Sequence, residues 1–352
     1  MRVLVTGGAG YIGSHTLLEL LGQGHEVCVV DNYENSGPAV LDRVRALSNG
    51  GKVTAQKGDI RHGQTLDNLM SNFAPEAVIH FAGLKAVGDS MADPLNYYDV
   101  NVNGTLALLH AMDRHGCRRI IFSSSATVYG EPIYLPYDEM HPLNPISVYG
   151  RTKMIAEHLI TDWAHAHADA SGVLLRYFNP VGAHSSAWIG ENPSNIPNNL
   201  MPLIAQVAVG KRAHLSIFGD DYNTPDGTGQ RDYIHVVDLA RAHVAALDYA
   251  ARTPGARPFN IGTGQAQSVR EMVTAFEAAS GMKIPCVVNP RRKGDIATMQ
   301  ANTTRANSEL GWRATHSLSD MAVSTWAWQS QNPNGYEGVV RVNLLEAGSS
   351  NL

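Results

Sequence analysis

Residues 1–13 read MRVLVTGGAGYIG, a short apolar strand that runs into three spaced glycines and then into a helical pattern. The run Val3–Thr6 is what a parallel strand buried on both faces requires. Gly7, Gly10 and Gly13 allow a tight turn and a close backbone approach, and the helix that follows offers its free amide groups to a pyrophosphate. We therefore predict a dinucleotide-binding turn here.

Strand-like and helix-like segments alternate through the first half of the chain. This alternation predicts a parallel sheet with helices on both faces, a Rossmann-like doubly wound α/β fold. The expected strands cover Val3–Thr6, Val27–Val30, Val53–Gln56, Ala77–Phe81, Ile120–Ser123 and Val173–Arg176, and the expected helices cover Ile12–Leu21, Thr65–Asn72, Pro94–Arg114 and Val148–His167.

The texture of the sequence changes after about Asn179. Residues 179–235 are rich in Pro, Gly and Asn, with a helix expected over Leu200–Val209, and shorter strands and helices follow. We predict a cofactor-binding domain over 1–178, to which some later segments return, and a smaller mixed α/β substrate region over 179–338. This region should close over a cleft at the carboxyl ends of the strands. Residues 339–352 are predicted to form a frayed tail.

Composition excludes several classes of protein. With 17% charged and 44% hydrophobic residues the chain is not disordered, and its net charge of −5 gives no support to nucleic-acid binding. Cys28, Cys117 and Cys286 lie far apart, so neither a disulfide framework nor a zinc site is expected. No signal peptide precedes the first strand and no apolar run is long enough to cross a bilayer. We expect a cytoplasmic protein without a metal or a membrane partner.

Asp31 closes the second expected strand, 18 residues after Gly13. A carboxylate at this place accepts hydrogen bonds from ribose hydroxyls and repels a 2′-phosphate, which favours NAD over NADP. The alternative, a tight turn without a ligand, does not account for strand, glycines and acid together. Gly58–Ile60 and His80–Gly83 end the third and fourth strands beside the same crevice, although either one alone is more often a plain strand end.

A proton-transfer pair follows further along the chain. Residues 149–153 read YGRTK, which places Tyr149 and Lys153 on one face of a helix. A neighbouring ammonium, together with a positively charged nicotinamide ring, favours tyrosinate and lowers the tyrosine pKa. The hydroxyl cluster 123–127 (SSSAT) ends a strand about two dozen residues earlier, where one serine can bind a substrate hydroxyl. The alternative is a chance pair on a surface helix.

These stretches resemble a known family. TGGAGYIG (6–13), FSSSATVYG (122–130) and YGRTK are similar to motifs of the extended short-chain dehydrogenase/reductases. Longer stretches resemble the UDP-glucose/galactose 4-epimerases, along about residues 1–330. These are HFAGLKAVGDS (80–90), LRYFNPVGAH (175–184), IPNNLMP (196–202), DGTGQRDYIHVVDLA (226–240) and PRRKGD (290–295).

The resemblance implies an activity, an NAD cofactor and a homodimer. Tyrosinate 149 takes the proton of the sugar 4-hydroxyl while C4 gives hydride to NAD⁺; the 4-keto sugar turns over and receives the hydride on its other face. Besides the glycines, Tyr149 and Lys153, the implied NAD contacts are Tyr11, Ile12, Asp31, Asn32, Asn35, Ser36, Asp59, Ile60, Phe81, Ala82, Gly83, Lys85 and Phe178. Besides Tyr149, the implied UDP-hexose contacts are Ser125, Thr127, Asn179, Asn199, Leu200, Ser216, Ile217, Phe218, Arg231, Arg292, Asp295 and Met299.

Two positions separate the alternatives within the superfamily. Related dehydratases follow the threonine with an Asp-Glu pair, whereas Val128 and Tyr129 follow Thr127 here, which disfavours dehydration. Met299 stands where the family carries a residue that gates the sugar pocket. Methionine is flexible and intermediate in size, so a UDP-N-acetylglucosamine/UDP-N-acetylgalactosamine 4-epimerase, or dual specificity, stays open. A second alternative is a silent NAD-sensing regulator, a class that usually lacks the Tyr-x-x-x-Lys pair.

Overall fold

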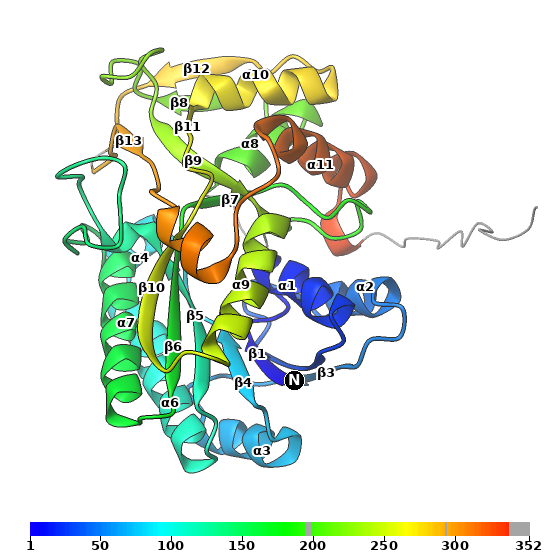
Figure 1. Cartoon of the computed structure of the whole chain (residues 1–352). Helices are drawn as coiled ribbons and strands as arrows, with labels where there is room; N and C mark the ends of the chain where they lie inside the picture. Colours follow the sequence, from blue (N-terminus) through cyan, green and yellow to red (C-terminus); the bar gives the residue numbers. More distant parts are fainter. Residues whose placement is uncertain (194–196, 198, 293, 338–352) are drawn as a thin grey trace, which may run out of the picture.

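Seven parallel strands form the central sheet of the computed structural model, in the order β10-β6-β5-β4-β1-β2-β3 (Figure 1). The structure describes residues 1–193, 197, 199–292 and 294–337, so the predicted tail over 339–352 lies outside it. The strands of this sheet are β1 (Arg2–Thr6), β2 (Glu26–Asp31), β3 (Val53–Lys57), β4 (Ala77–His80), β5 (Arg119–Ser125), β6 (Ser171–Tyr177) and β10 (Gly255–Ile261).

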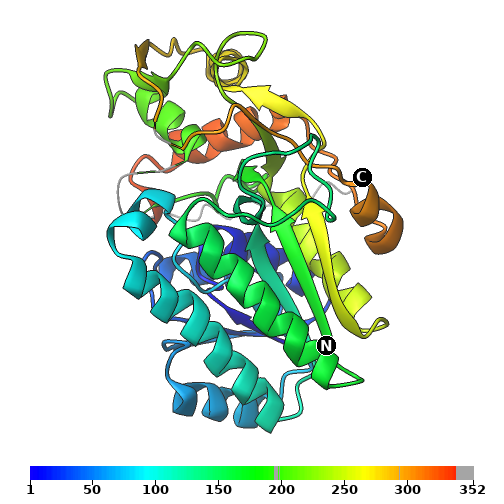
Figure 2. The ribbon, with the colours of Figure 1, turned by 90° about the vertical axis from the view of Figure 1, so that its left-hand side faces the viewer.

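Helices cover both faces of this sheet (Figures 1 and 2). Val3 and Val5 of β1 pack into one core with α1 (Tyr11–Gly22), α2 (Ala39–Leu47) and α9 (Val236–Ala250). Leu4, between them, packs into a second core on the opposite face. The helices of that face are α3 (Gly63–Phe73), α6 (Gly104–Arg114) and α7 (Val148–Ala166). The predicted doubly wound α/β fold is confirmed, because alternate residues of one strand feed two separate cores.

The prediction of a single helix over Pro94–Arg114 is wrong in detail. The segment is divided into α5 (Pro94–Tyr98), a π-helical turn over Asp99–Asn103 and α6, and a short α4 (Val87–Ala92) precedes it. The carboxamide of Asn101, inside the π-helical turn, bonds the backbone of Leu84 at 2.8 and 3.0 Å and the Thr152 hydroxyl at 2.9 Å. Widened turns of this kind occur mostly at functional sites, and local periodicity does not reveal them.

Two segments from the second half of the chain pack with the main sheet and its helices. β10 pairs with β6 along its edge, and α9 packs against α1. β10 was not predicted from the sequence, because its half-buried run GARPFNI carries Arg257 and Pro258. Proline is acceptable there because an edge strand leaves one side of its backbone unpaired.

Most of the remaining elements form the smaller region above the carboxyl ends of the main sheet (Figure 1). β9 (Gln230–His235) pairs with β7 (Asn179–Val181), β11 (Ala266–Ser268) and β13 (Thr298–Met299), while β8 (Leu215–Phe218) pairs with β12 (Cys286–Asn289). The helices α8 (Leu200–Ala208), α10 (Val269–Ser280) and α11 (Leu318–Gln331) complete this region. The short turn Ala306–Leu310 instead packs into the same core as Val3 and Val5, and two further short turns cover Ala126–Val128, directly after β5, and Gly335–Glu337.

None of the helices within the described ranges combines the length and apolar character that a bilayer crossing requires.

Candidate functional site

The glycine-rich turn joins β1 to α1 with almost no room for side chains. A Cβ atom on Gly7 would lie 2.6 Å from the Ala82 nitrogen, and one on Gly13 would lie 2.6 Å from the Gly7 oxygen. Gly10 precedes α1 and offers no side-chain cap to its first amide groups. These amides and the positive end of the helix dipole suit an anionic group, so the turn fits the pyrophosphate of a dinucleotide.

Asp31 lies beside this turn and is buried. Its carboxylate accepts hydrogen bonds from the Ala9 amide at 3.0 Å, the Tyr33 amide at 2.9 Å and the Ser36 hydroxyl at 3.0 Å. A carboxylate offers about four acceptor positions, so these three donors leave room for a ribose hydroxyl. The side chain of Asp31 thus holds the turn in place through its hydrogen bonds.

Further predicted cofactor residues lie on the loops after β3 and β4. Hydrogen bonds from Arg61 lower the pKa of Asp59 to about 2, which keeps this carboxylate charged. The side chain of Asn32 reaches the same carboxylate at 3.4 Å. Ile60 is buried against Gly104.

The loop after β4 runs between the glycine-rich turn and α7. The ring of Phe81 lies 4.6 Å from the ring of His243, and the amide of Ala82 touches Gly7. A Cβ atom on Gly83 would approach the Lys153 nitrogen to 3.8 Å. This loop therefore connects the predicted cofactor residues with the predicted proton-transfer residues.

Tyr149 and Lys153 lie in the first turns of α7. The helix is capped by Ser147, whose hydroxyl accepts a hydrogen bond from the Gly150 amide at 3.0 Å. Lys153 donates to the carbonyl oxygen of Ser123, at the end of β5, at 2.8 Å. Its nitrogen lies 5.9 Å from the centre of the Tyr149 ring. Both side chains are buried, so the pair faces the interior rather than solvent.

Burial dominates the electrostatics of this pair. It raises the pKa of Tyr149 well above the ordinary value, and Tyr177 adds to this, while a hydrogen bond with Ser125 lowers it. Burial also lowers the pKa of Lys153 to about 8. Without a bound cofactor, burial therefore has a larger effect on the pKa of Tyr149 than the ammonium group of Lys153. Two positive charges were predicted from the sequence to favour tyrosinate, the Lys153 ammonium and the nicotinamide ring. Formation of tyrosinate at neutral pH would then depend on the nicotinamide ring.

The structure distinguishes the three serines at the end of β5. Ser123 shares a hydrogen bond of 2.5 Å with the Tyr177 hydroxyl, and Ser124 donates to Glu157 at 2.5 Å. Ser125 instead accepts from the amide and the hydroxyl of Thr127, at 3.2 and 3.0 Å. Ser125 is also the serine of this cluster whose side chain hydrogen-bonds Tyr149 and so lowers the pKa of that tyrosine.

The predicted substrate residues form two groups. The guanidinium carbon of Arg292 lies 4.7 Å from the centre of the Phe218 ring, and its Nε lies 2.9 Å from Asp295. Met299 pairs with Arg231 across β13 and β9 and packs into the same cluster as Phe178. Arginines beside an aromatic ring and a carboxylate suit a nucleoside diphosphate, through phosphate contacts, base stacking and ribose hydrogen bonds.

Other predicted residues are less closely joined. Within the described ranges, the side chains of Asn35, Asn179 and Ser216 make no hydrogen bond to another candidate. Ile217 is buried in the core of the smaller region, which leaves only its backbone for a ligand, and Leu200 begins α8.

Two side chains that were not predicted from the sequence contact the predicted site. The Tyr177 hydroxyl forms a hydrogen bond with Ser123, and Tyr177 adds to burial in raising the pKa of Tyr149. Glu191 accepts a hydrogen bond from Asn199 at 2.7 Å and lies 3.7 Å from Lys85. The only local signal for Tyr177 is its place beside Phe178, and Glu191 has none. In the part of the chain that the structure describes, no group of three or more His, Cys, Asp or Glu side chains could hold a metal ion.

Known proteins share these features along nearly the whole chain. The model of the NAD dependent epimerase/dehydratase family matches residues 3–262. The UDP-glucose 4-epimerase of Bacillus subtilis (strain 168) is 52% identical over 337 residues, or 96% of this chain and 99% of that protein. The Homo sapiens UDP-glucose 4-epimerase is 52% identical over 345 residues, or 95% and 98%. The crystal structure of the Bifidobacterium longum UDP-glucose 4-epimerase with NAD⁺ and UDP has a TM-score of 0.92 at 49% identity, covering 95% of this chain and 100% of that one.

The position of Asp31 predicts the choice of cofactor. The unmodified protein should bind NAD far more tightly than NADP, and Asp31→Ala should narrow the difference, because it removes the charge that repels a 2′-phosphate. Asp31→Asn should act in the same direction while keeping an acceptor for the turn. Titration of the cofactor-stripped proteins with NAD and NADP measures this. Equal affinity of the unmodified protein for both cofactors would contradict the assignment.

Proposed function

The chain belongs to the NAD dependent epimerase/dehydratase family, and on this premise we propose that it interconverts UDP-galactose and UDP-glucose as an NAD-dependent UDP-glucose 4-epimerase. The observation that carries this proposal is the meeting of Tyr149, Lys153 and Ser125 at the carboxyl end of β5. Relatives with the UDP-glucose 4-epimerase name are 52% identical over nearly their whole length, which supports the same activity here. Turnover of UDP-galactose and UDP-glucose by the purified protein tests it.

Each of the candidate residues has a separate role in the proposed reaction. Tyr149 is the base for the sugar 4-hydroxyl, and Ser125 bonds that hydroxyl and orients it. Lys153, held on the Ser123 carbonyl, keeps a positive charge near the tyrosine. Bound NAD⁺ supplies the hydride acceptor and, once reduced, the hydride donor. Arg231 and Arg292 anchor the diphosphate, so that the sugar can turn between the two transfers.

The surroundings of Thr127 support epimerisation rather than dehydration. The next two side chains, Val128 and Tyr129, are fully buried. The Tyr129 hydroxyl donates to Asn260 at 2.6 Å, away from an acid-base role. No carboxylate stands at these two positions to assist the loss of water.

We assign the protein to galactose metabolism in the cytoplasm. The proposed reaction links UDP-galactose to UDP-glucose, and the three cysteines are free thiols, as a reducing compartment favours. Fractionation of the source cells tests the location; recovery of the protein outside the cytoplasm would refute it.

Tyr149 is predicted to be essential. Tyr149→Phe should lower turnover at neutral pH by about 100-fold or more while NAD stays bound, because the ring remains and the base is lost. Lys153→Ala should lower activity and move the pH optimum upward, since loss of the ammonium raises the tyrosine pKa and tyrosinate then forms only at higher pH. pH–rate profiles of the variants measure both effects. Tyr134→Phe, on an exposed loop, is the control, and near-normal turnover of Tyr149→Phe would rule the assignment out.

Met299 is predicted to set the breadth of sugar use. The unmodified protein should convert UDP-glucose and UDP-galactose well and UDP-N-acetylglucosamine only partly. Met299→Tyr should suppress the N-acetyl reaction by filling the space of an acetamido group, and Met299→Ala should increase it. The ratio of kcat/KM for the two sugar pairs decides the matter. A ratio that stays constant across the three proteins would show that selectivity lies elsewhere.

We further propose a homodimer. Met91, Leu95 and Leu106, on the successive helices α4, α5 and α6, are exposed in the single chain, and such apolar side chains favour burial against a second copy. Light scattering on the purified protein should give twice the mass of the chain, and the double variant Leu95→Glu/Leu106→Glu should give a lower mass. A chain that is monomeric without substitution would disprove the proposal.

A further inference from the structure

Glu191 lies between the predicted cofactor and substrate residues. It stands on the segment between β7 and α8, and 11% of its side chain is exposed. One of its oxygens, Oε1, accepts a hydrogen bond from Nδ2 of Asn199 at 2.7 Å and lies 3.7 Å from Nζ of Lys85. Lys85 is a predicted NAD contact and Asn199 a predicted UDP-hexose contact. A single carboxylate oxygen therefore joins residues of both sites.

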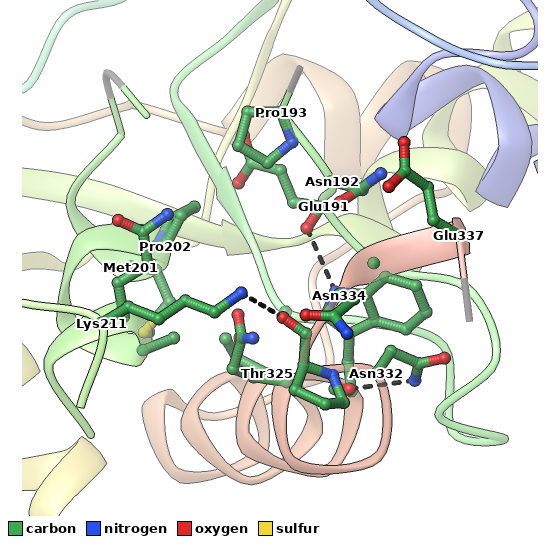
Figure 3. Close-up of a pocket in the computed structure, with 17 residues that line it drawn as sticks. Glu191, Asn192, Pro193, Met201, Pro202, Lys211, Thr325, Asn332, Asn334 and Glu337 are labelled. Carbon is green, nitrogen blue, oxygen red and sulfur yellow. Dashed lines mark hydrogen bonds between the residues drawn. The ribbon is translucent and has the colours of Figure 1, made fainter. Parts of the chain in front are cut away.

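The backbone around Glu191 is held without help from its side chain. The indole nitrogen of Trp328 donates to the Glu191 carbonyl at 3.1 Å, and the Tyr336 hydroxyl bonds the amide and the carbonyl of Gly190 at 3.1 and 2.8 Å. Glu191 and Trp328 line a cavity of about 320 Å³, to whose wall Glu337 also belongs (Figure 3). Anchoring of the loop is thus already provided, and the carboxylate has another role.

Burial makes this carboxylate costly unless its partners compensate. Burial raises the pKa of Glu191, whereas the charge of Lys85 and the hydrogen bond from Asn199 lower it. NAD and the UDP-hexose both carry a negatively charged diphosphate, so a carboxylate beside predicted contacts of both ligands would also be unfavourable by itself. A buried acid at such a place calls for a gain that outweighs both costs.

Orientation of Asn199 supplies that gain. A free carboxamide can rotate and can exchange the places of its oxygen and nitrogen. When one N–H is bound to Glu191, the amide oxygen and the second N–H have fixed directions toward a ligand. We propose that Glu191 is a positioning residue that orients Asn199 for the nucleotide of the substrate and ties it to Lys85 of the cofactor site. This inference rests on the proposed function and adds to it a residue that couples the two sites.

Two substitutions of Glu191 should differ in their effect on the affinity for UDP. If Glu191 acted only as a charge, its removal would relieve repulsion and tighten the binding of UDP. If it orients Asn199, Glu191→Ala should weaken UDP binding by about tenfold, as expected when a hydrogen bond to a charged group is lost. Glu191→Gln keeps an oxygen for Asn199 and removes the charge. It should therefore bind UDP at least as tightly as the unmodified protein.

A double-mutant cycle with Asn199 provides the decisive measurement. Calorimetric titration of the NAD-loaded proteins with UDP gives dissociation constants for the unmodified protein, Glu191→Ala, Asn199→Ala and the double variant. The double variant should bind UDP within about twofold of Asn199→Ala, because Glu191 has nothing to orient once Asn199 is absent. Glu337→Gln, an exposed acid on the same cavity, is the matched control and should bind UDP normally.

Unchanged or tighter UDP binding by Glu191→Ala, or additive effects in the cycle, would overturn the proposal. If Glu191→Ala does not fold, Glu191→Asp replaces it, because the shorter side chain withdraws the oxygen from Asn199 while keeping the charge; normal UDP binding by Glu191→Asp would likewise overturn the proposal. An unmodified protein that binds no UDP would refute the proposed function instead.

Discussion

A buried ion pair fixes the helix that carries Tyr149 and Lys153 to the sheet beneath it. Glu157 of α7 and Arg176 of β6 approach to 2.6 Å, with 2% and 6% of their side chains exposed. Ser124 donates to the same glutamate, and Arg176 also donates to the Tyr129 hydroxyl at 3.2 Å. Removal of one partner from such a pair typically costs ~3–5 kcal/mol, because the other charge stays buried. α7 is therefore fixed in rotation and height relative to β5 and β6.

The positions of Lys153 and Tyr149 depend on how this ion pair fixes α7 against the sheet. Lys153, one turn before Glu157, reaches the end of β5 and leaves Tyr149 beside Ser125. The strands of the smaller region are short, and its arginines carry the charge that suits a nucleotide. Under the proposed function, α7 and the main sheet hold the reacting groups in fixed positions, while the substrate is bound through its UDP group only. The sugar is then free to present either face.

The sequence could predict those parts whose physics is local. The glycine turn, the alternating strands and the Tyr149–Lys153 spacing depend on near neighbours, and the predicted fold is confirmed. The edge strand β10 was not foreseen, because its polar half does not resemble a buried strand. The contact of Glu191 with Lys85 was not foreseen either, because 106 residues separate them, and only the folded chain brings them together. The pKa of Tyr149 depends on its burial, which no motif records.

Under the proposed function, the sugar loses and regains the same hydrogen at C4, while Tyr149 transfers only the hydroxyl proton. Epimerisation of UDP-galactose by the NAD-loaded protein in D₂O, followed by NMR of the product, tests this most directly. Return of an internally held hydride predicts UDP-glucose without deuterium at C4. Deuterium at C4 would rule out return of the hydride from NADH, because it would mean that the carbon-bound hydrogen leaves as a proton and exchanges with solvent.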